Sequence, residues 1–243
     1  MIPHFLVDPG QISAQHAVLG DEDTRHLTAV LRARAGDEMT VADGEGTIYA
    51  ARFDRVRDGL AVVVLGASRY QPPERPSVTV VHALPKQRKL DGVVQRLTEL
   101  GVERIVPVHS ERSQVVLDER KAVKAVARWR SIAVAAAKQS RASRVPRVTE
   151  VGDWREAFAE GLPGVVCWEE SATGFRAALD GVPVADRLVI GIGPEGGLTH
   201  EEVEATGLAH GSLGPTVLRT ETAALVAVAA LRFHYGLMEN PDT

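Results

Sequence analysis

The sequence predicts an α/β protein with two domains, a small N-terminal β-barrel and a larger domain built on a parallel sheet. Up to about residue 70, short extended runs alternate with hairpin signals. Later residues alternate apolar strands with amphipathic helices, which is typical of a parallel sheet. Between these regions, Tyr70–Ser77 holds three prolines in eight residues and favours a stiff linker. We therefore expect domains at 1–70 and 78–243, joined by a linker at 71–77.

The N-terminal domain is expected to begin with one short helix, at 21–34, where apolar residues recur at helical spacing. Three extended runs follow between 37 and 66. They are separated by Asp43–Gly46 and by Asp58-Gly59, both of which are typical of hairpin turns. Short strands joined by hairpins favour a small barrel.

The second domain is expected to alternate buried strands with helices that cover both faces of the sheet. The predicted strands are 78–84, 104–108, 165–168 and 188–192. The predicted helices include 90–100, which ends at a glycine, and the long amphipathic segment 121–139.

The composition is that of a soluble globular protein, with 44% hydrophobic and 25% charged residues. No apolar run reaches membrane-spanning length, and the N-terminus lacks the basic and apolar regions of a signal peptide. The single cysteine, Cys167, fits a reducing compartment and is expected to pack on a buried strand. We therefore expect a cytoplasmic protein with no membrane partner.

The net charge of −4 conceals a strong asymmetry along the chain. Residues 86–147 hold 15 Lys/Arg and 6 Asp/Glu, a local charge of +9, whereas the remainder carries −13. One basic block in an acidic protein indicates a polyanionic partner such as nucleic acid. The alternative is a set of solvated helix faces with no partner.

A glycine-rich turn follows the last predicted strand, where Gly191, Gly193 and Gly196 match the pattern G-x-G-x-x-G. A dinucleotide site is disfavoured, because the match lies late in the chain and no acid follows at the distance that holds a ribose. Glu195 inside the turn would also repel a pyrophosphate. The glycines instead allow a backbone that approaches a ligand closely, or form a tight turn without a ligand. Thr199-x-x-Glu202 is a capping box that begins a helix.

A second compact turn, Leu213–Pro215, precedes Arg219–Thr222 and a nearly all-apolar helix. Such a helix is expected to be buried, in a core or in a subunit interface. Thr220 or Thr222 is expected to cap its N-terminus. A cationic side chain opposes the helix dipole at that end, which suggests that Arg219 has another role.

These two C-terminal motifs, IGPEGGLTHEEVE and LGPTVLRTETAAL, resemble those of the RsmE-type SPOUT methyltransferases, which methylate N3 of a uridine in 16S ribosomal RNA. The upstream stretches LPKQRKLDGVVQRLTELGVERIVPVHSERS and RHLTAVLRARAGDE carry the resemblance across essentially the whole chain. It implies a PUA-like RNA-binding barrel and a SPOUT domain with a deep trefoil knot. It also implies S-adenosylmethionine as cofactor without a metal, a homodimer, and the small ribosomal subunit as partner.

The resemblance and the two turns together give a set of expected cofactor-binding residues. They are Trp168, Glu169, Gly191, Gly193, Pro194, Glu195, Gly196, Gly197, Leu213, Gly214, Leu218, Thr220 and Thr222. The histidines show no metal-ligand spacing, and one cysteine cannot make a zinc site.

Methylation of uracil N3 requires removal of its proton or stabilisation of the resulting charge. Arg219 is the candidate for that stabilisation, and Glu221 or Glu195 for the proton acceptor. The alternative is that these residues form structural ion pairs, such as Arg219 with Glu221. Phosphate contacts are expected from Arg25, Arg32, Arg34, Lys86, Arg88, Lys89, Arg112, Lys138, Arg141 and Arg144.

The leading hypothesis is thus an S-adenosylmethionine-dependent rRNA methyltransferase. A non-catalytic RNA-binding or ribosome-assembly factor of the same fold is the second hypothesis. A nicotinamide oxidoreductase is the third, and the missing ribose acid disfavours it.

Overall fold

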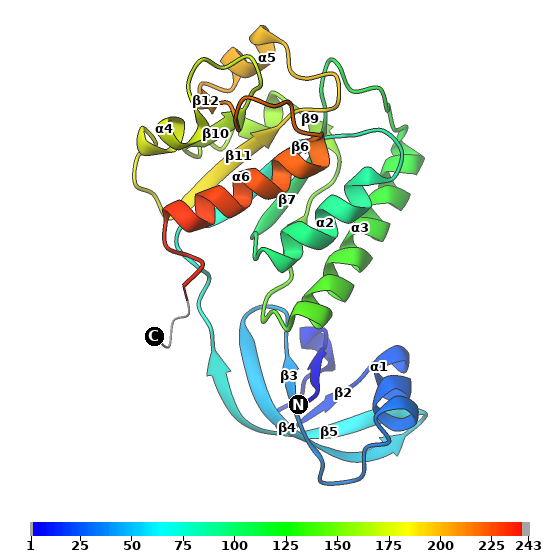
Figure 1. Cartoon of the computed structure of the whole chain (residues 1–243). Helices are drawn as coiled ribbons and strands as arrows, with labels where there is room; N and C mark the ends of the chain where they lie inside the picture. The colour runs from blue at the N-terminus through cyan, green and yellow to red at the C-terminus, as the bar shows by residue number, and fades with distance from the viewer. Residues whose placement is uncertain (1, 240–243) are drawn as a thin grey trace. The chain divides into compact units, whose positions relative to one another are not determined.

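The structure is a computed structural model that describes residues 2–239 (Figure 1). The chain forms two compact units. Within the described residues, the first comprises 2–73 together with 134–145, and the second comprises 74–133 and 146–239. The segment 134–145, which the sequence assigns to the second domain, therefore clusters with the first unit. The reason is local packing, because Ala137 contacts Leu6 and Ala42 in a small apolar cluster.

The first unit is built on a five-stranded sheet in the order β1-β3-β4-β5-β2. Its strands are β1 (His4–Leu6), β2 (His16–Val18), β3 (Glu38–Ala42), β4 (Thr47–Arg57) and β5 (Leu60–Tyr70). The antiparallel pairs β3-β4 and β4-β5 confirm both predicted hairpins. Gly44 and Gly46 in the first turn and Asp58 and Gly59 in the second adopt the positive φ that such turns need.

The predicted helix 21–34 ends earlier in the structure. It consists of α1 (Asp21–Arg25) followed by a π-helical turn, His26–Val30. Arg32 has a φ of 53°, which is incompatible with a continuing right-handed helix. Leu27 is the buried apolar residue of the π turn, and it packs in the core of the sheet with Phe5, Leu19 and Val63.

The second unit is built on a parallel sheet of seven strands in the order β12-β10-β11-β6-β7-β8, with β9 pairing β7. The strands are β6 (Ser77–Ala83), β7 (Arg104–His109), β8 (Arg147–Val148), β9 (Gly152–Asp153), β10 (Gly164–Cys167), β11 (Arg187–Ile192) and β12 (Ala209–Gly211). The four strands that the sequence predicts are all present. Because every pair is parallel, the carboxyl ends of β6, β10, β11 and β12 meet at one edge, where ligands bind in open α/β sheets.

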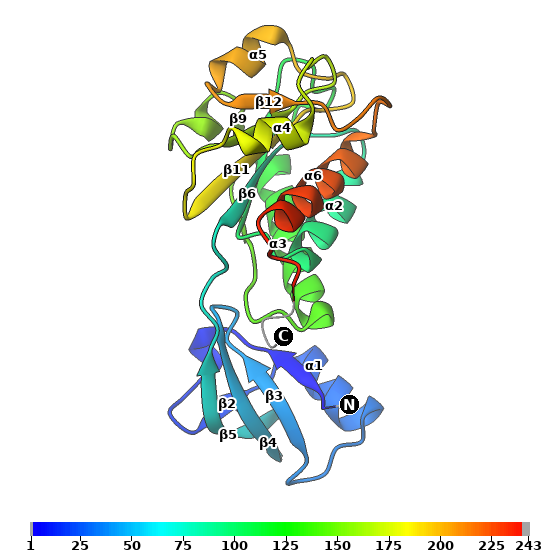
Figure 2. The same ribbon diagram turned by 60° about the vertical axis from the view of Figure 1, so that its left-hand side comes forward.

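The helices of this unit are α2 (Lys89–Glu99), α4 (Phe175–Asp180), α5 (His200–Ala205) and α6 (Thr220–His234). Helix α3 (Glu119–Ser140) belongs to it up to residue 133. Short 3₁₀ turns lie at Pro9–Gln11 and Glu156–Phe158. Helices α2 and α6 pack side by side, and α6 lies against β6 and β11 (Figure 2). On the sheet, Trp154, Leu198 and Val203 pack with Val81 and Val189. No helix within residues 2–239 is long and apolar enough to span a membrane.

The capping box that the sequence predicts is present at the start of α5. The Thr199 hydroxyl accepts the backbone N–H of Glu202, and the Glu202 carboxylate accepts the N–H of Thr199. Glu202 is buried, and its other oxygen accepts the backbone N–H of Glu111 at 2.8 Å. One carboxylate thus fixes both the glycine-rich turn and the loop after β7.

Candidate active site

A cavity of about 310 Å³ lies at the carboxyl edge of the parallel sheet. Three segments form it, namely the end of β10, the turn after β11 and the loop that leads into α6. Ten of the thirteen residues expected around the cofactor line it. They are Trp168, Glu169, Gly193, Pro194, Glu195, Gly197, Leu213, Gly214, Leu218 and Thr220.

The other three expected residues lie outside the cavity lining. Gly191 lies within β11, where a Cβ would come 3.1 Å from the Trp154 ring, so this glycine serves packing. Gly196 faces the loop after β7, because a Cβ there would lie 3.1 Å from Arg112 Cβ. Thr222 is exposed on the first turn of α6.

The cavity lining also includes Arg219, the expected charge stabiliser, and residues that the sequence did not assign to the site. The latter are Cys167, Ile192, Ser212, Pro215, Thr216, Val217 and Ala223. Cys167 is buried as expected of a packing residue, and burial raises the pKa of its thiol. Its place directly before Trp168, at the end of β10, was the signal in the sequence that it would reach the cavity.

Two glycines make the turn after β11 possible. A Cβ at Gly193 would lie 2.8 Å from Leu198 Cγ, closer than van der Waals contact allows. Gly197 has a φ of +72°, and a Cβ there would overlap Glu169 Oε1. Gly193 therefore has no room for a side chain, whereas a side chain at Gly197 would strain the backbone and displace the exposed Glu169 carboxylate. As glycines, both present only backbone to the cavity.

Trp168 forms part of the cavity wall and is held between two histidines. Its ring centroid lies 5.2 Å from that of His210, edge to face, and 5.6 Å from that of His200. Trp168 Nε1 is buried and has no hydrogen-bond acceptor among the residues that the structure describes. A buried donor without an acceptor is costly unless a ligand accepts its hydrogen bond.

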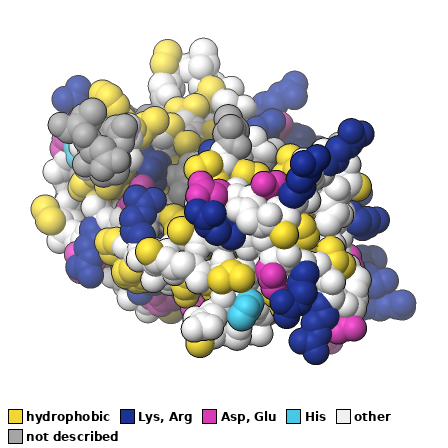
Figure 3. Space-filling model, turned by 90° about the horizontal axis from the view of Figure 1, so that it is seen from below, with side chains coloured by type: hydrophobic (Ala, Val, Ile, Leu, Met, Phe, Trp, Pro, Cys, Tyr) yellow, Lys and Arg dark blue, Asp and Glu magenta, His cyan; other side chains and the backbone are white. Residues whose placement is uncertain are grey.

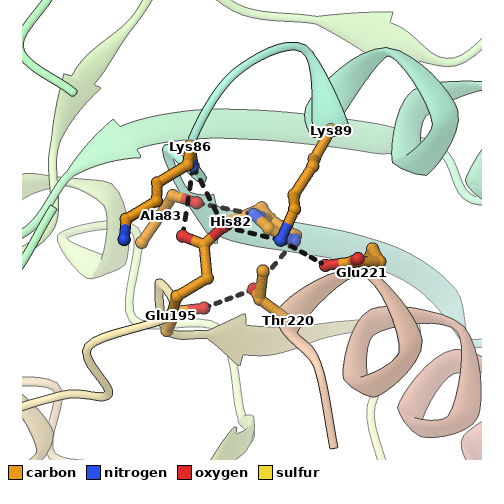
Figure 4. A network of polar contacts seen from close by, with 8 residues as sticks. His82, Ala83, Lys86, Lys89, Glu195, Thr220 and Glu221 are labelled. Atoms are coloured by element: carbon orange, nitrogen blue, oxygen red, sulfur yellow. Dashed lines mark hydrogen bonds and ion pairs between the residues drawn. The ribbon is translucent and has the colours of Figure 1, made fainter. Parts of the chain in front are cut away.

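Beside the cavity, a lysine from α2 contacts two carboxylates from different elements (Figure 4). Lys89 Nζ lies 2.9 Å from Glu195 Oε1 and 3.5 Å from Glu221 Oε2. Both oxygens of Glu195 also lie 3.1 Å from the backbone N–H of Lys86, which donates to them. Glu221 Oε2 is buried, and its ion pair with Lys89 is longer than that of Glu195.

The pKa values reflect this arrangement. Burial alone would raise the pKa of Glu195, but the hydrogen bonds from Lys89 and from the N–H of Lys86 outweigh it and leave that pKa below its ordinary value. The hydrogen bond to Glu195 raises the pKa of Lys89. Glu195 is therefore ionised at neutral pH and is a poor proton acceptor.

Thr220 joins the two C-terminal motifs. Its hydroxyl donates to the backbone oxygen of Gly193 at 2.6 Å, and His82 Nε2 lies 3.5 Å from the same hydroxyl (Figure 4). His82 is fully buried, and burial lowers its pKa, so the ring is neutral. Its Nδ1 donates to Ala83 O at 2.7 Å.

The expectation that Thr220 or Thr222 caps α6 is wrong. Arg219 occupies the N-cap position, and no side chain caps the helix there. The alternative ion pair between Arg219 and Glu221 is also wrong, since Glu221 pairs with Lys89 and the described chain holds no ion pair of Arg219. Arg219 is exposed at the cavity wall.

Comparison with known proteins places this site in a family. Residues 72–232 match a family described as an RNA methyltransferase domain, and residues 19–65 match an RNA methyltransferase PUA domain. The ribosomal RNA small subunit methyltransferase E of Bacillus subtilis is 34% identical over 229 residues, which cover 89% of this chain and 90% of the relative. The protein of the same name from Mycobacterium tuberculosis is 34% identical over 239 residues, covering 93% and 90%.

The chain belongs to the ribosomal RNA small subunit methyltransferase E family.

Solved structures of similar proteins agree with this assignment. The methyltransferase E of Neisseria gonorrhoeae, solved with S-adenosyl methionine bound, is 30% identical and has a TM-score of 0.83, covering 96% of this chain and 98% of the other. A putative methyltransferase from Legionella pneumophila, solved in complex with the cofactor SAM, is 26% identical with a TM-score of 0.78, again covering 96% and 98%. The predicted order, a PUA-like domain followed by a parallel-sheet methyltransferase domain, is confirmed.

Within this methyltransferase, several cations expected to contact phosphates are engaged by the protein itself. Lys89 belongs to the carboxylate cluster, and Lys138 pairs with Asp23 at 2.7 Å. The Arg144 guanidinium lies over the Tyr70 ring and donates to its hydroxyl. Sequence reasoning missed these partners because each lies more than 60 residues away along the chain.

The remaining expected phosphate contacts are exposed, and two of them have partners nearby. Arg112 donates to Gly196 O at 3.3 Å, and Arg88 pairs with Asp91. The exposed residues without an ion pair in the described part of the chain are Arg25, Arg32, Arg34, Lys86 and Arg141. Figure 3 shows one face of the molecule, where Lys and Arg side chains project singly and in small groups among acidic and apolar ones.

Proposed function

We propose that the chain transfers the methyl group of S-adenosylmethionine to N3 of a uridine in the 16S rRNA of the small ribosomal subunit. The observation that carries this proposal is the cavity built by the glycine turn after β11 and the 213–220 loop. It supports methyl transfer because the chain belongs to the methyltransferase E family, and the Neisseria gonorrhoeae member binds S-adenosyl methionine. The relatives named above are ribosomal RNA small subunit methyltransferases, which supports the choice of substrate.

The residues present fit this cofactor. Gly193 and Gly197 line the cavity and, lacking side chains, present only backbone to a ligand. Trp168 Nε1 offers a buried donor without an acceptor among the described residues. When bound, S-adenosylmethionine supplies an electrophilic methyl group. In the described chain no three His, Cys, Asp or Glu side chains gather as a metal would require.

Arg219 is the proposed stabiliser of charge on the uracil ring. It lines the cavity, is exposed, and has no carboxylate partner in the described chain. A guanidinium in that state is free to donate to the oxygens of a deprotonated uracil. The exposure of Arg219 supports this role over the structural ion pair.

Glu221 is the proposed proton acceptor. Glu195 already accepts from the Lys86 N–H and from Lys89, and its lowered pKa makes it weakly basic. Glu221 Oε2 makes no hydrogen bond within the described chain and has only a 3.5 Å ion pair with Lys89, so it is the less engaged of the two carboxylates. Glu221 lies outside the cavity lining, so receipt of the N3 proton requires the uracil to reach it beside Lys89. Glu195 and Lys89 then act as the frame that positions Glu221.

We also propose functional domains at 1–70 and 78–243 with a linker at 71–77, a cytoplasmic location and a homodimer. The apolar residues that α6 leaves exposed support the dimer, since Phe233 is 79% exposed and Val226 is 38% exposed. A deep trefoil knot around the cavity is part of the same proposal. The convergence of the turn after β11 and the loop after β12 on one cavity supports it.

Calorimetric titration with S-adenosylhomocysteine, with NADH as the comparison ligand, tests the cofactor. We expect saturable binding of the first ligand and none of the second. Gly197→Ala should weaken binding, because the left-handed backbone costs about 1–2 kcal/mol and the added Cβ displaces the Glu169 carboxylate, which lines the cavity. Gly161→Ala is the matched control, since Gly161 has a φ of +66° and open space around it.

Each outcome separates the hypotheses. NADH binding would restore the dinucleotide interpretation of the glycine turn. RNA binding without S-adenosylhomocysteine binding would favour a non-catalytic RNA-binding factor. Equal losses in the two glycine variants would show that backbone strain, and not the turn beside Glu169, controls the affinity.

A further inference from the structure

A second cleft, of about 240 Å³, lies in the methyltransferase unit away from the lining of the first cavity. It is formed by the 84–90 turn, by residues of the loop after β7 and by the first three turns of α3. Its apolar lining includes Leu90, Leu117 and the ring of Trp129. Three cations, Lys121, Lys124 and Arg128, share the lining, and no carboxylate belongs to it.

The three cations are not equivalent. Arg128 donates to Asp91 at 3.0 Å and lies over the Trp129 ring, so it is committed to the protein. Lys121 pairs only with Asp118, and both side chains are largely exposed, which makes this pair weak. Lys124 is exposed and forms no ion pair within residues 2–239. Two ammonium groups are thus available to an external anion.

An apolar cleft whose lining includes one weakly paired and one unpaired lysine suits a nucleotide. A base can leave the stack in single-stranded RNA and enter an apolar pocket, while the adjacent phosphates contact lysines. We propose that this cleft binds one unstacked nucleotide of a single-stranded RNA segment, with its base in the cleft and its phosphates on Lys121 and Lys124. The proposal rests on the proposed function, because it takes RNA as the substrate.

The position of the cleft favours RNA over a protein partner. The 84–90 turn has two sides, and Pro85, Gln87 and Leu90 line the cleft. From the same turn, the Lys86 N–H and Lys89 Nζ hold Glu195 at the first cavity. A strand that places one nucleotide in the cleft therefore binds at the turn that frames the proposed methylation site.

The loop after β7 gives a second connection between the two sites. Val115 and Leu117 line the cleft, and Arg112 of the same loop donates to Gly196 O in the glycine turn. The cleft and the cofactor cavity are thus linked through two separate segments. A nucleotide flanking the target uridine is the RNA position that fits this placement.

The test is fluorescence anisotropy of a labelled single-stranded RNA of about ten nucleotides, measured with the full chain over a range of salt concentrations. In K121Q/K124Q the log–log salt slope should fall by about 1.4, at about 0.7 per lost phosphate contact. The corresponding loss of affinity is roughly 25-fold near 0.1 M salt. Arg176→Gln is the matched control, since Arg176 is exposed on α4 and unpaired in the described chain.

A second variant tests the cleft apart from the charge. Val115→Phe fills the cleft without changing the charge, so it should weaken RNA binding and leave the salt slope unchanged. S-adenosylhomocysteine affinity should stay at the wild-type value in every variant, which also verifies that each one folds.

Three results would overturn the proposal. The first is an unchanged affinity and slope in K121Q/K124Q, which would leave the cleft to another partner such as a protein. The second is an equal loss in the Arg176→Gln control. The third is wild-type RNA binding by Val115→Phe. Failure of the wild-type chain itself to bind RNA would instead contradict the proposed function.

Discussion

Lys89 is the single side chain that connects three elements of the site. It extends from α2 to Glu195 in the glycine turn and to Glu221 at the start of α6. Without its charge, the two carboxylates would face each other with only the Lys86 N–H as donor to Glu195. We therefore regard Lys89 as a positioning residue for the proposed proton acceptor.

Lys89→Met should lower kcat at neutral pH by about 10–100-fold, the equivalent of one lost hydrogen bond to a charged group. The split between kcat and KM gives a more specific readout. KM for S-adenosylmethionine should stay near the wild-type value, because Lys89 does not line the cofactor cavity. Lys89→Arg keeps the cation and should retain most activity. A change in that KM as large as the fall in kcat in Lys89→Met would argue against the positioning role.

Only some of the individual site residues could be predicted from the sequence. The motifs located ten of the cavity residues, because glycines and a capping box mark the turn locally. They did not predict the carboxylate partners of Lys89, which lie 106 and 132 residues further along the chain and are brought together only by the fold. His82 was missed for the same reason, since nothing near it in sequence indicates contact with Thr220.

At the scale of elements, α5 anchors the site through Glu202. Its carboxylate accepts the N–H of Thr199 in its own capping box and the N–H of Glu111 in the loop after β7. The sequence predicted the capping box, since that pattern is local. It did not predict the bond to Glu111, which the parallel arrangement of β7 and β11 around β6 makes possible.

Glu202→Ala should destabilise the methyltransferase unit by about 2–3 kcal/mol, because it leaves two backbone donors without their charged acceptor. Thermal unfolding should show a melting temperature lower by roughly 4–12 °C. Glu201→Ala is the control, since Glu201 is exposed on the same turn and should change the melting temperature little. Equal shifts in the two variants would mean that Glu202 contributes only as a helix former.

The elements of the two sheets were largely predictable from periodicity and turn residues. The ends of the four predicted strands of the second sheet differ from the observed ends by at most one residue. The predicted capping box and hairpins are also present. The length of the helix predicted at 21–34 was overestimated. The left-handed backbone of Arg32 ends it, and no sequence pattern predicts that conformation. The grouping of 134–145 with the first unit was not predictable either. The amphipathic pattern of α3 is continuous, so it contains no sign of a boundary between the units.

At the scale of the whole molecule, the charge asymmetry remains the strongest indication of RNA in the sequence. The block 86–147 carries +9 within a chain of net charge −4. The structure divides those cations into two kinds. Some, such as Lys89, Arg128 and Arg144, hold the protein together, and others, such as Lys121 and Lys124, are available to a partner.

Methylation of a small-subunit rRNA uridine at N3 can be measured directly. The chain is incubated with methyl-labelled S-adenosylmethionine and with small subunits from cells that lack this methyltransferase, and the rRNA is then digested to nucleosides. We expect label in 3-methyluridine for the wild type and less label for Gly197→Ala. Label in any other nucleoside, or none with the wild type despite bound S-adenosylhomocysteine, would contradict the proposed function.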